Sequence, residues 1–245
     1  PENSPLVFVL HGYTSNSNNI MNYSRMNSIA EEKGFAVCYP QGTNNEMTGM
    51  PHWNANIKPM SSVPDSDFLT QLAKLLQDQY KLSKENTFVS GMSNGGFMSY
   101  TLACEQSGTF KAIASVTGSM TPETYNSCNP IHSTSVMQIH GDADTVVPYF
   151  GNWRSRSIPS VMEYWEEYNN CQTSNISSVP DNNSDGNGGL FYLYDECIAE
   201  VQAQLYLMTN MGHEWPRLSN DNDINAADVI WNFFQQYDIN GRINE

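Results

Sequence analysis

The chain alternates between short apolar runs and longer segments whose apolar residues recur at helical spacing. The first run, PLVFVL at residues 5–10, is continuously apolar, as a strand buried on both faces of a sheet should be. Strands that alternate with helices predict an α/β fold with a mostly parallel central sheet and helices on both faces. We expect strands at residues 5–10, 35–39, 87–90, 112–117, 135–140, 190–194 and 203–208.

The clearest helical pattern covers residues 65–80. Its apolar residues form one stripe at steps of three and four, which consists of Phe68, Leu69, Leu72, Leu75, Leu76 and Tyr80. Segments 40–64 and 118–134 show neither period and are expected to be long loops, which often line sites. Further helices are expected at residues 20–33 (closed by Gly34), 94–105 and 160–169, and after a cap at Asn225.

Composition and charge exclude several classes of function. The 245 residues, 39% of them hydrophobic, suffice for one core, so we expect a single domain over residues 1–245. The formal charge of −15, from 26 acidic and 11 basic residues, would repel nucleic acids. No apolar run approaches the roughly 18 residues that a membrane span needs. We therefore expect no nucleic acid and no membrane as partners, and no sequence feature indicates an obligate protein partner.

Five cysteines are too few for a disulfide scaffold, and their number is odd. Cys38 lies in the strand-like GFAVCYP and is expected to be a buried free thiol, which leaves four cysteines for at most two bridges. Spacing does not determine the connectivity, and five reduced core cysteines are the alternative. As a guess, we pair Cys104 with Cys128 and Cys171 with Cys197.

The start of the chain bears on its location. The chain begins at Pro1 and contains no signal peptide, so we expect that processing or trimming has removed a segment. Disulfides would permit export, and we expect a secreted or periplasmic protein.

A glycine-rich turn separates the expected strand at 87–90 from the expected helix at 94–105. It reads Gly91-Met92-Ser93-Asn94-Gly95, and a G-x-S-x-G pattern between a strand and a helix is typical of a nucleophile elbow. The two glycines relieve the crowding of so tight a turn. Ser93 is therefore the candidate nucleophile, and a simple packing turn is the alternative.

The chain order Ser, Asp, His that this elbow requires selects its two partners. His213, in MGHEWP, is the only histidine late enough, because the others precede any suitable acid: His11, His52, His132 and His140. The acid is expected in GDADTVVP, where Asp144 is favoured because TVVP can pack beneath it, while Asp142 is better suited to capping the turn. Asp195 is a weaker third candidate.

Backbone amides near these residues can stabilise an oxyanion. The Asn94 amide lies at the start of the helix after Ser93. In LHGYT, residues 10–14, the glycine lets the loop fold over the site, so we assign the second amide to Tyr13, with Thr14 as the fallback. Candidates for substrate binding are Trp53, Tyr149 and Trp215, whose flat side chains suit an aromatic acyl group or a polyester, unless the tryptophans brace the loops from beneath.

The motifs LHGYT, SGMSNGGFMSYTLACE, HGDADTVVPY, and GHEWP followed by INAADVIWNFF, resemble the α/β-hydrolase superfamily. More narrowly, the chain is similar to the bacterial esterase group of polyhydroxybutyrate depolymerase-like and feruloyl esterase-like enzymes. The resemblance implies an α/β-hydrolase catalytic domain with Ser93 as nucleophile, Asp144 as acid and His213 as base, and no cofactor. The family usually has strands before the HG strand, so an N-terminal hairpin is expected to be absent or cut off. The family's cysteine near the tryptophan motif has no counterpart in PHWNAN.

The sequence therefore predicts a serine carboxylic-ester hydrolase for small-molecule or polymeric esters, whether short-chain, polyester-derived, feruloyl or acetyl. A serine peptidase-like amide hydrolase is the first alternative, but its usual access-restricting domain does not fit in 245 residues. A catalytically dead binding module is the second alternative, although such proteins typically lose a member of the triad.

A possible metal loop remains at residues Asp181 to Gly186. Its sequence DNNSDG matches the first half of a calcium loop, with oxygen ligands at positions one, three and five. The twelfth position, which requires a bidentate carboxylate, is Tyr192. Runs of Asn, Asp and Gly usually form turns, so we expect no metal site.

Overall fold

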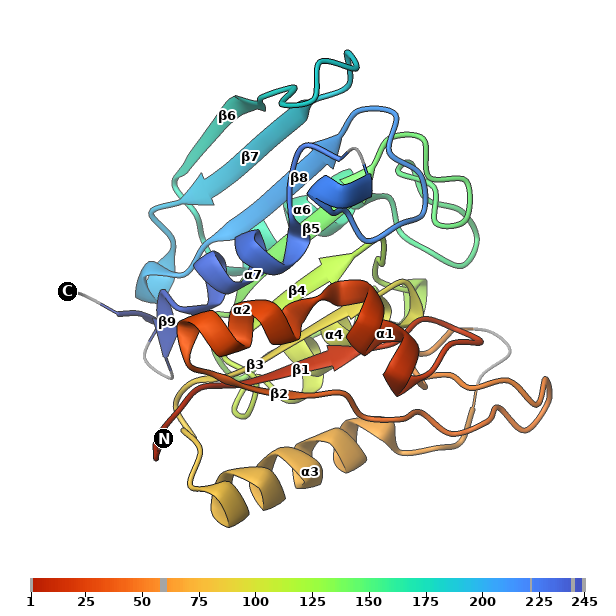
Figure 1. Ribbon diagram of the computed structural model, residues 1–245, viewed down its shortest axis with the longest axis vertical. Coiled ribbons are helices and arrows are strands. Elements are labelled where there is room, and N and C mark those ends of the chain that lie inside the picture. The colour runs from red at the N-terminus through yellow and green to blue at the C-terminus, as the bar shows by residue number, and fades with distance from the viewer. Residues whose placement is uncertain (1, 58–60, 221, 239–240, 244–245) are drawn as a thin grey trace.

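An eight-stranded sheet forms the centre of the structure, a computed structural model that describes residues 2–57, 61–220, 222–238 and 241–243 (Figure 1). The order across the sheet is β2-β1-β3-β4-β5-β8-β7-β6. In chain order, the strands are β1 Leu6–Leu10, β2 Ala36–Cys38, β3 Thr87–Met92, β4 Ala112–Val116, β5 Ser135–Gly141, β6 Thr173–Val179, β7 Gly189–Asp195 and β8 Ala203–Met208.

The sheet is parallel from β2 to β8 and antiparallel at its far edge. Strands β1 to β5 and β8 pair in parallel, whereas β7 runs antiparallel to both β8 and β6. The carboxyl ends of the parallel strands therefore meet at one edge of the sheet, where open α/β sheets bind ligands. The fold class expected from the sequence is confirmed.

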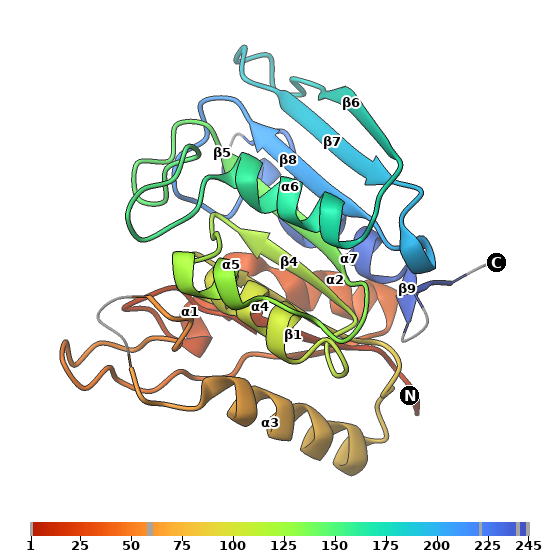
Figure 2. The same cartoon turned by 180° about the vertical axis from the view of Figure 1, so that it is seen from behind.

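Helices cover both faces of the sheet. Three lie on the near face in Figure 1, namely α1 Ser17–Ser24, α2 Met26–Lys33 and α7 Ala226–Phe234. The others lie on the face seen in Figure 2, namely α3 Asp65–Tyr80, α4 Asn94–Glu105, α5 Pro122–Ser127 and α6 Ile158–Tyr168. Short elements complete the described chain: 3₁₀ turns at Ile198–Glu200 and Leu218–Asn220, and a two-stranded ribbon of β9 Tyr237–Asp238 and β10 Gly241–Arg242.

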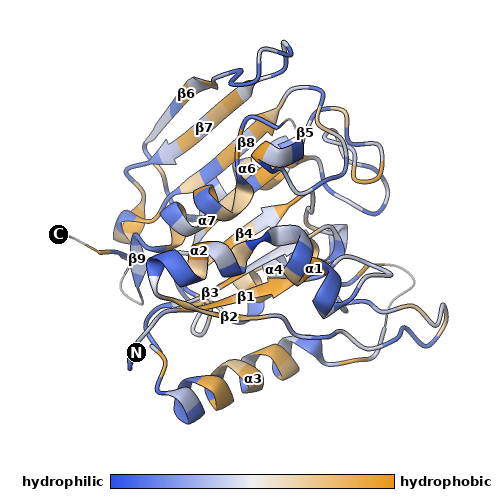
Figure 3. Ribbon diagram, viewed as in Figure 1, coloured by the Kyte–Doolittle hydropathy of each residue, from blue (hydrophilic) through white to orange (hydrophobic). Residues whose placement is uncertain are grey.

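Each face of the sheet has its own hydrophobic core. Phe8 and Leu10 of β1 point to the cluster beneath α3, α4 and α6, whereas Val7 and Val9 point to the cluster beneath α1, α2 and α7. This alternation explains why β1 is continuously apolar, because a strand covered on both sides buries every side chain. Figure 3 shows the resulting apolar colour on the middle strands of the sheet.

Several expected elements are corrected by the structure. The helix expected at 20–33 is two helices, because Arg25 adopts a left-handed conformation (φ 58°) between them. The loop expected at 118–134 contains α5, which begins with Pro122 and is capped by the Thr121 side chain. Strand β6 was not expected at all, because its sequence TSNISSV is polar and mostly exposed at the sheet edge.

The apolar stripe predicted for α3 is only partly buried. Leu69 and Ala73 are fully buried against the core, but Phe68, Leu75 and Tyr80 are exposed. The banded colouring of α3 in Figure 3 shows that apolar and polar residues alternate along the helix. The helix ends were predicted correctly at both residues, so the period identified the helix while its buried face was assigned too broadly. Asn225 does precede α7, but its side chain donates to Asp228 instead of capping the helix.

The two guessed disulfides are present. Cys104 is bonded to Cys128, and Cys171 to Cys197. Cys38 is free, as expected, although it is half-buried and not fully buried, and burial raises the pKa of its thiol to about 11. The first bridge ties α4 to the segment after α5, and the second ties the segment after α6 to the segment after β7. Within the described residues, no helix has the length and apolar character needed to span a membrane.

Candidate active site

Ser93 lies in the tight turn between β3 and α4. Its backbone has φ 55° and ψ −119°, a combination that costs an ordinary residue about 1–3 kcal/mol. The turn is fixed on both sides, because the Ser93 amide donates to the Val116 carbonyl at 2.8 Å and the Phe97 amide donates to the Ser93 carbonyl at 2.9 Å. A strained serine that is held by its neighbours in this way is the geometry expected of a nucleophile elbow.

The two glycines of the elbow are required by close packing. A Cβ at Gly91 would lie 2.3 Å from the carbonyl atoms of Gly95, and a Cβ at Gly95 would lie 2.3 Å from the Leu10 carbonyl oxygen. Neither backbone contact can relax cheaply. The G-x-S-x-G spacing therefore lets the start of α4 pack directly against the end of β1.

His213 and Asp144 form a hydrogen-bonded pair. The His213 Nδ1 atom lies 2.8 Å from the Asp144 Oδ2 atom, across 69 positions of sequence. Asp144 follows β5 and His213 follows β8, and these two strands are neighbours in the sheet. The half-buried His213 ring donates through Nδ1, which leaves its Nε2 atom free to act as a base.

The turn after β5 holds the Asp144 carboxylate. Its other oxygen, Oδ1, accepts the amides of Val146 at 2.8 Å and Val147 at 2.9 Å. Burial opposes the charged form, but the hydrogen bonds from His213 and from these two amides outweigh it and keep the pKa of Asp144 below its ordinary value. Asp144 is thus ionised at neutral pH, as the acid of a triad must be.

The structure separates Asp144 from the two competing acids. Asp142 accepts the backbone amide of Asn210 at 2.7 Å and so ties together the loops after β5 and β8. Asp195 ends β7, which is antiparallel to β8, so it lies at the opposite edge of the sheet from Met208 and the His213 loop. Of the three acids, Asp144 is the one that bonds to His213 among the described residues, and its role as the acid stays a prediction.

A buried polar chain beneath the acid turn was missed from the sequence. The His140 Nε2 atom donates to the Val147 carbonyl at 2.8 Å, and its Nδ1 atom pairs with Gln138 at 2.9 Å. Gln138 in turn accepts from the Tyr100 hydroxyl at 2.9 Å. The available signal was Gln138 and His140 at alternate positions of a strand in which Val136, Met137 and Ile139 are apolar. Burial lowers the pKa of His140, which therefore stays neutral.

The two amides assigned to the oxyanion lie next to Ser93. Asn94 is the residue after it, and a Cβ at Gly12 would lie 3.5 Å from the Ser93 Cβ atom, which brings the Gly12–Tyr13 peptide to the elbow. Among the described residues, neither the Asn94 nor the Tyr13 amide has a hydrogen-bond acceptor. The amide of the fallback residue Thr14 already donates to the Pro51 carbonyl at 2.9 Å, and the assignment of the second oxyanion amide to Tyr13 stays a prediction.

The three candidate pocket residues differ in burial. Trp53 is 1% exposed and Trp215 is 0% exposed, so neither ring offers a surface to a substrate. Burial favours the alternative that the tryptophans brace the loops from within. Tyr149 is half-buried with its ring centroid 6.4 Å from that of His140, beside the acid turn, and burial raises its pKa to about 12. Tyr149 remains a candidate for substrate binding.

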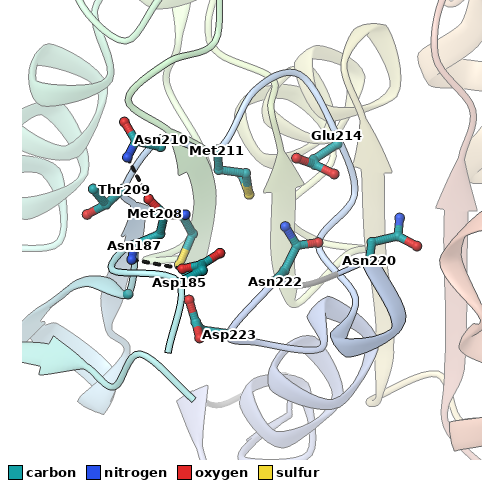
Figure 4. A pocket seen from close by; sticks show the side chains of 11 residues that line it. Asp185, Asn187, Met208, Thr209, Asn210, Met211, Glu214, Asn220, Asn222 and Asp223 are labelled. Carbon is teal, nitrogen blue, oxygen red and sulfur yellow. Dashed lines mark hydrogen bonds between the residues drawn. The ribbon is translucent and has the colours of Figure 1, made fainter. Parts of the chain in front are cut away.

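The turn at residues 181–188 borders a hollow that also involves the loop around His213 (Figure 4). Carboxylate oxygens of Asp181, Asp185 and Asp223 come within 4.8 Å of one another there. However, Asp181 accepts the amides of Asp185 and Gly186, and Asp223 accepts that of Asn182 at 2.6 Å. These bonds fit the turn that the sequence indicated, and the absence of a metal stays a prediction.

The fold and the site together define a class of protein. A serine elbow after β3, an acid after β5 and a histidine after β8 occur in that order along a mostly parallel sheet, which is the arrangement of an α/β hydrolase. A family model described as "Esterase PHB depolymerase" matches residues 1–165. The chain belongs to this family of carboxylic-ester hydrolases. Ser93 and Asp144 lie within the matched residues, and His213 lies beyond them.

Several curated proteins are similar over nearly the whole chain. A bifunctional acetylxylan esterase/xylanase of Neocallimastix patriciarum is 21% identical over 99% of this chain, which spans 32% of that protein. Feruloyl esterase C of Emericella nidulans is 25% identical over 94% of this chain, which spans 77% of it. For several relatives the chain spans only 32% to 57% of their length.

Solved structures share the fold. An acetyl xylan esterase from Aspergillus awamori superposes with a TM-score of 0.67 at 15% identity, over 95% of this chain and 89% of its own. A Bacillus cereus carboxylesterase superposes with a TM-score of 0.60 at 15% identity, over 93% of this chain and 87% of its own. At such low identity, these likenesses establish the α/β-hydrolase fold alone.

Proposed function

We propose that this chain is a serine carboxylic-ester hydrolase in which Ser93 is the nucleophile, His213 the base and Asp144 the acid. The observation that carries the proposal is the 2.8 Å bond between His213 and Asp144, because it joins the two predicted partners of Ser93 across distant parts of the chain. Membership of the esterase family supports the same reaction class.

The first half of the reaction forms an acyl-enzyme. The Ser93 Oγ atom attacks the ester carbonyl carbon while the His213 Nε2 atom accepts its proton. The bond between the carbonyl carbon and the leaving oxygen then breaks, and His213 returns the proton to the leaving alcohol. Asp144 accepts from Nδ1 throughout and stabilises the imidazolium without taking its proton.

The second half regenerates the enzyme by the reverse path. Water attacks the acyl carbon while the His213 Nε2 atom accepts its proton. His213 then returns this proton to the Ser93 Oγ atom as the bond between Oγ and the acyl carbon breaks and the carboxylic acid leaves. In both halves the carbonyl oxygen becomes negative, and the free amides of Asn94 and Tyr13 donate to it. Each step uses only residues of this chain, the ester and water, so the proposal includes no cofactor.

Serine replacement tests the proposal directly. Ser93→Ala should lower the turnover of a p-nitrophenyl ester by at least about 10⁴-fold, because the nucleophile is removed from the triad. Ser66→Ala is a matched control, since the Ser66 hydroxyl bonds to Glu105 on the surface of α3 and α4. A fluorophosphonate should label the wild-type protein and Ser66→Ala at one residue, and should not label Ser93→Ala.

Three results would contradict the proposal. Retained esterase activity in a folded Ser93→Ala protein would exclude Ser93 as nucleophile, and an unlabelled, inactive wild-type protein would instead indicate a dead binding module. Faster cleavage of a peptide anilide than of an acetyl or butyryl ester would favour the amide-hydrolase alternative.

The substrate class is a finer part of the proposal. The relatives named for acetylxylan and feruloyl esters support an acetyl or feruloyl ester, and the family description also supports a polyester. A panel of p-nitrophenyl acyl esters beside methyl ferulate and a hydroxybutyrate oligomer would rank these classes by kcat/KM. The two disulfides favour action outside the cytoplasm, in keeping with a secreted or periplasmic protein.

A further inference from the structure

The buried side chain of Asn94 clamps the start of α4 to the long loop that follows β2. Its Oδ1 atom accepts the Trp53 amide at 2.7 Å, and its Nδ2 atom donates to the Trp53 carbonyl at 2.9 Å. Two hydrogen bonds to one residue fix both the position and the orientation of that residue. The residue after the nucleophile is therefore held by its side chain as well as by the helix.

Trp53 carries this clamp across to β1. Its indole Nε1 atom donates to the His11 carbonyl at 3.0 Å, and the two rings have centroids 5.0 Å apart. Two residues earlier in the loop, the Pro51 carbonyl accepts the Thr14 amide at 2.9 Å. Residues 51–53 thus contact α4 on one side and both flanks of the Gly12–Tyr13 peptide on the other.

His11 determines which way the Tyr13 amide points. Its Nε2 atom accepts the Gly42 amide at 3.0 Å, so the proton is on Nδ1, which lies 2.8 Å from the Gly12 carbonyl oxygen. That carbonyl also accepts the Ser15 amide at 3.2 Å. In a trans peptide the carbonyl and the following N–H point in opposite directions, so a fixed Gly12 carbonyl aims the Tyr13 N–H. Burial lowers the pKa of His11 and keeps its ring neutral.

We infer that Asn94, Trp53 and His11 are positioning residues that hold the two oxyanion amides at a fixed separation and direction. The inference rests on the proposed function, because it concerns the amides that would bind the oxyanion. Donors that are already in place need no reorganisation when charge develops, and a misplacement of about 1 Å can cost about 100-fold in rate. Substitutions of these three positioning residues should therefore reduce kcat and leave KM nearly unchanged.

The first test compares Asn94→Ala with wild type, using kcat expressed per site labelled by a fluorophosphonate. We expect kcat to fall about 10- to 100-fold while KM stays within about threefold, because the backbone N–H of residue 94 remains but the side-chain bonds that hold it to Trp53 are lost. Inhibition by a phenylboronic acid, which forms a tetrahedral anion on the serine, should weaken by a factor similar to the loss of kcat/KM.

A second variant keeps the test valid if Asn94→Ala fails to fold, because Asn94 is buried. Trp53→Phe keeps the clamp from Asn94 and most of the ring volume, and it removes only the indole donor to His11. We expect a smaller loss of kcat, about 3- to 30-fold, again at nearly constant KM. The double variant should lose less than the product of the two single effects, because both residues act through one network.

Asn54→Ala is the matched control on the same loop. The Asn54 side chain donates to the Val63 carbonyl at 2.8 Å and has no contact with the oxyanion amides among its hydrogen bonds in the described chain. It should leave kcat per labelled site within about twofold of wild type, even if the melting temperature falls.

The outcomes separate this inference from the proposed function. If Ser93→Ala is inactive but Asn94→Ala and Trp53→Phe both keep wild-type kcat per labelled site, the hydrogen bonds of Asn94 and Trp53 are only structural and the inference is overturned. If they lose kcat at constant KM while Asn54→Ala does not, the inference is supported. An active Ser93→Ala protein would refute the proposed function itself, and this inference with it.

Discussion

The two halves of the candidate site are held in place by different physical means. Around Ser93, backbone packs against backbone, with glycines at the points where a side chain would collide with a carbonyl. Around Asp144 and His213, polar side chains and amides form a hydrogen-bonded chain that continues through His140. The nucleophile side should therefore be sensitive to volume, and the acid and base side to charge and pH.

The difference follows from what each half must do. A nucleophile on a strained turn needs rigid surroundings, since close-packed backbone cannot relax away from the strain. An acid and a base must hold or move a proton, so their surroundings set pKa values through hydrogen bonds. Three substitutions and a change of pH test this contrast between packing and charge.

Asp144→Asn should have the largest effect, and it acts on charge with almost no change in volume. We expect kcat for a p-nitrophenyl ester at neutral pH to fall about 10³- to 10⁴-fold, because an amide can no longer hold His213 in the required tautomer or stabilise its charged form. Asp142→Asn is the control, because Asp142 bonds to the Asn210 amide and not to His213. Equal losses from both variants would contradict the assignment of the acid.

Gly95→Ala adds one methyl group on the nucleophile side. Its Cβ would lie 2.3 Å from the Leu10 carbonyl oxygen, so we expect the free energy of unfolding to drop by about 1–3 kcal/mol in urea denaturation. Gly108→Ala is the control, since its Cβ would meet only the flexible end of the exposed Ile131 side chain at 3.2 Å. If Gly95→Ala proved as stable as its control, packing would not be what confines this turn.

Acidification should affect the polar half through His140. Because burial lowers the pKa of this ring below 6.5 in the folded protein, its contribution to stability is complete above pH 6.5 and is lost as the pH falls toward the lowered value. The free energy of unfolding should therefore decrease between pH 7.5 and 5.5, by up to about 1.4 kcal/mol per pH unit for each such histidine.

His140→Gln measures the share of His140 in that decrease. Glutamine does not titrate, so the variant should show a shallower pH dependence than wild type, while His11, whose pKa burial also lowers, still contributes. The lowered pKa of Asp144 places its own contribution at a more acidic pH, outside this window. Identical slopes in both proteins would show that His140 does not titrate differently on folding.

Much of the fold could be predicted from local pattern. The apolar run of β1 and the period of α3 identified these elements, because burial on both faces of a strand or one face of a helix leaves a regular mark. The sequence of strand β6 has no such apolar pattern, since an exposed edge strand can be polar. The break at Arg25 was also invisible, because a single left-handed residue does not interrupt the apolar spacing of its neighbours.

From the sequence alone we could name candidates for the chemistry. The elbow pattern, the chain order and the single late histidine indicated Ser93 and His213, because the order of elements in a parallel sheet limits which loops can meet, and the family resemblance favoured Asp144 over Asp142 as the acid. The hydrogen bonds that the Asn94 and Trp53 side chains make became visible only in the tertiary structure. The bonds between these two residues join positions 41 residues apart, and no local period or spacing indicates which buried polar groups will pair at such a distance.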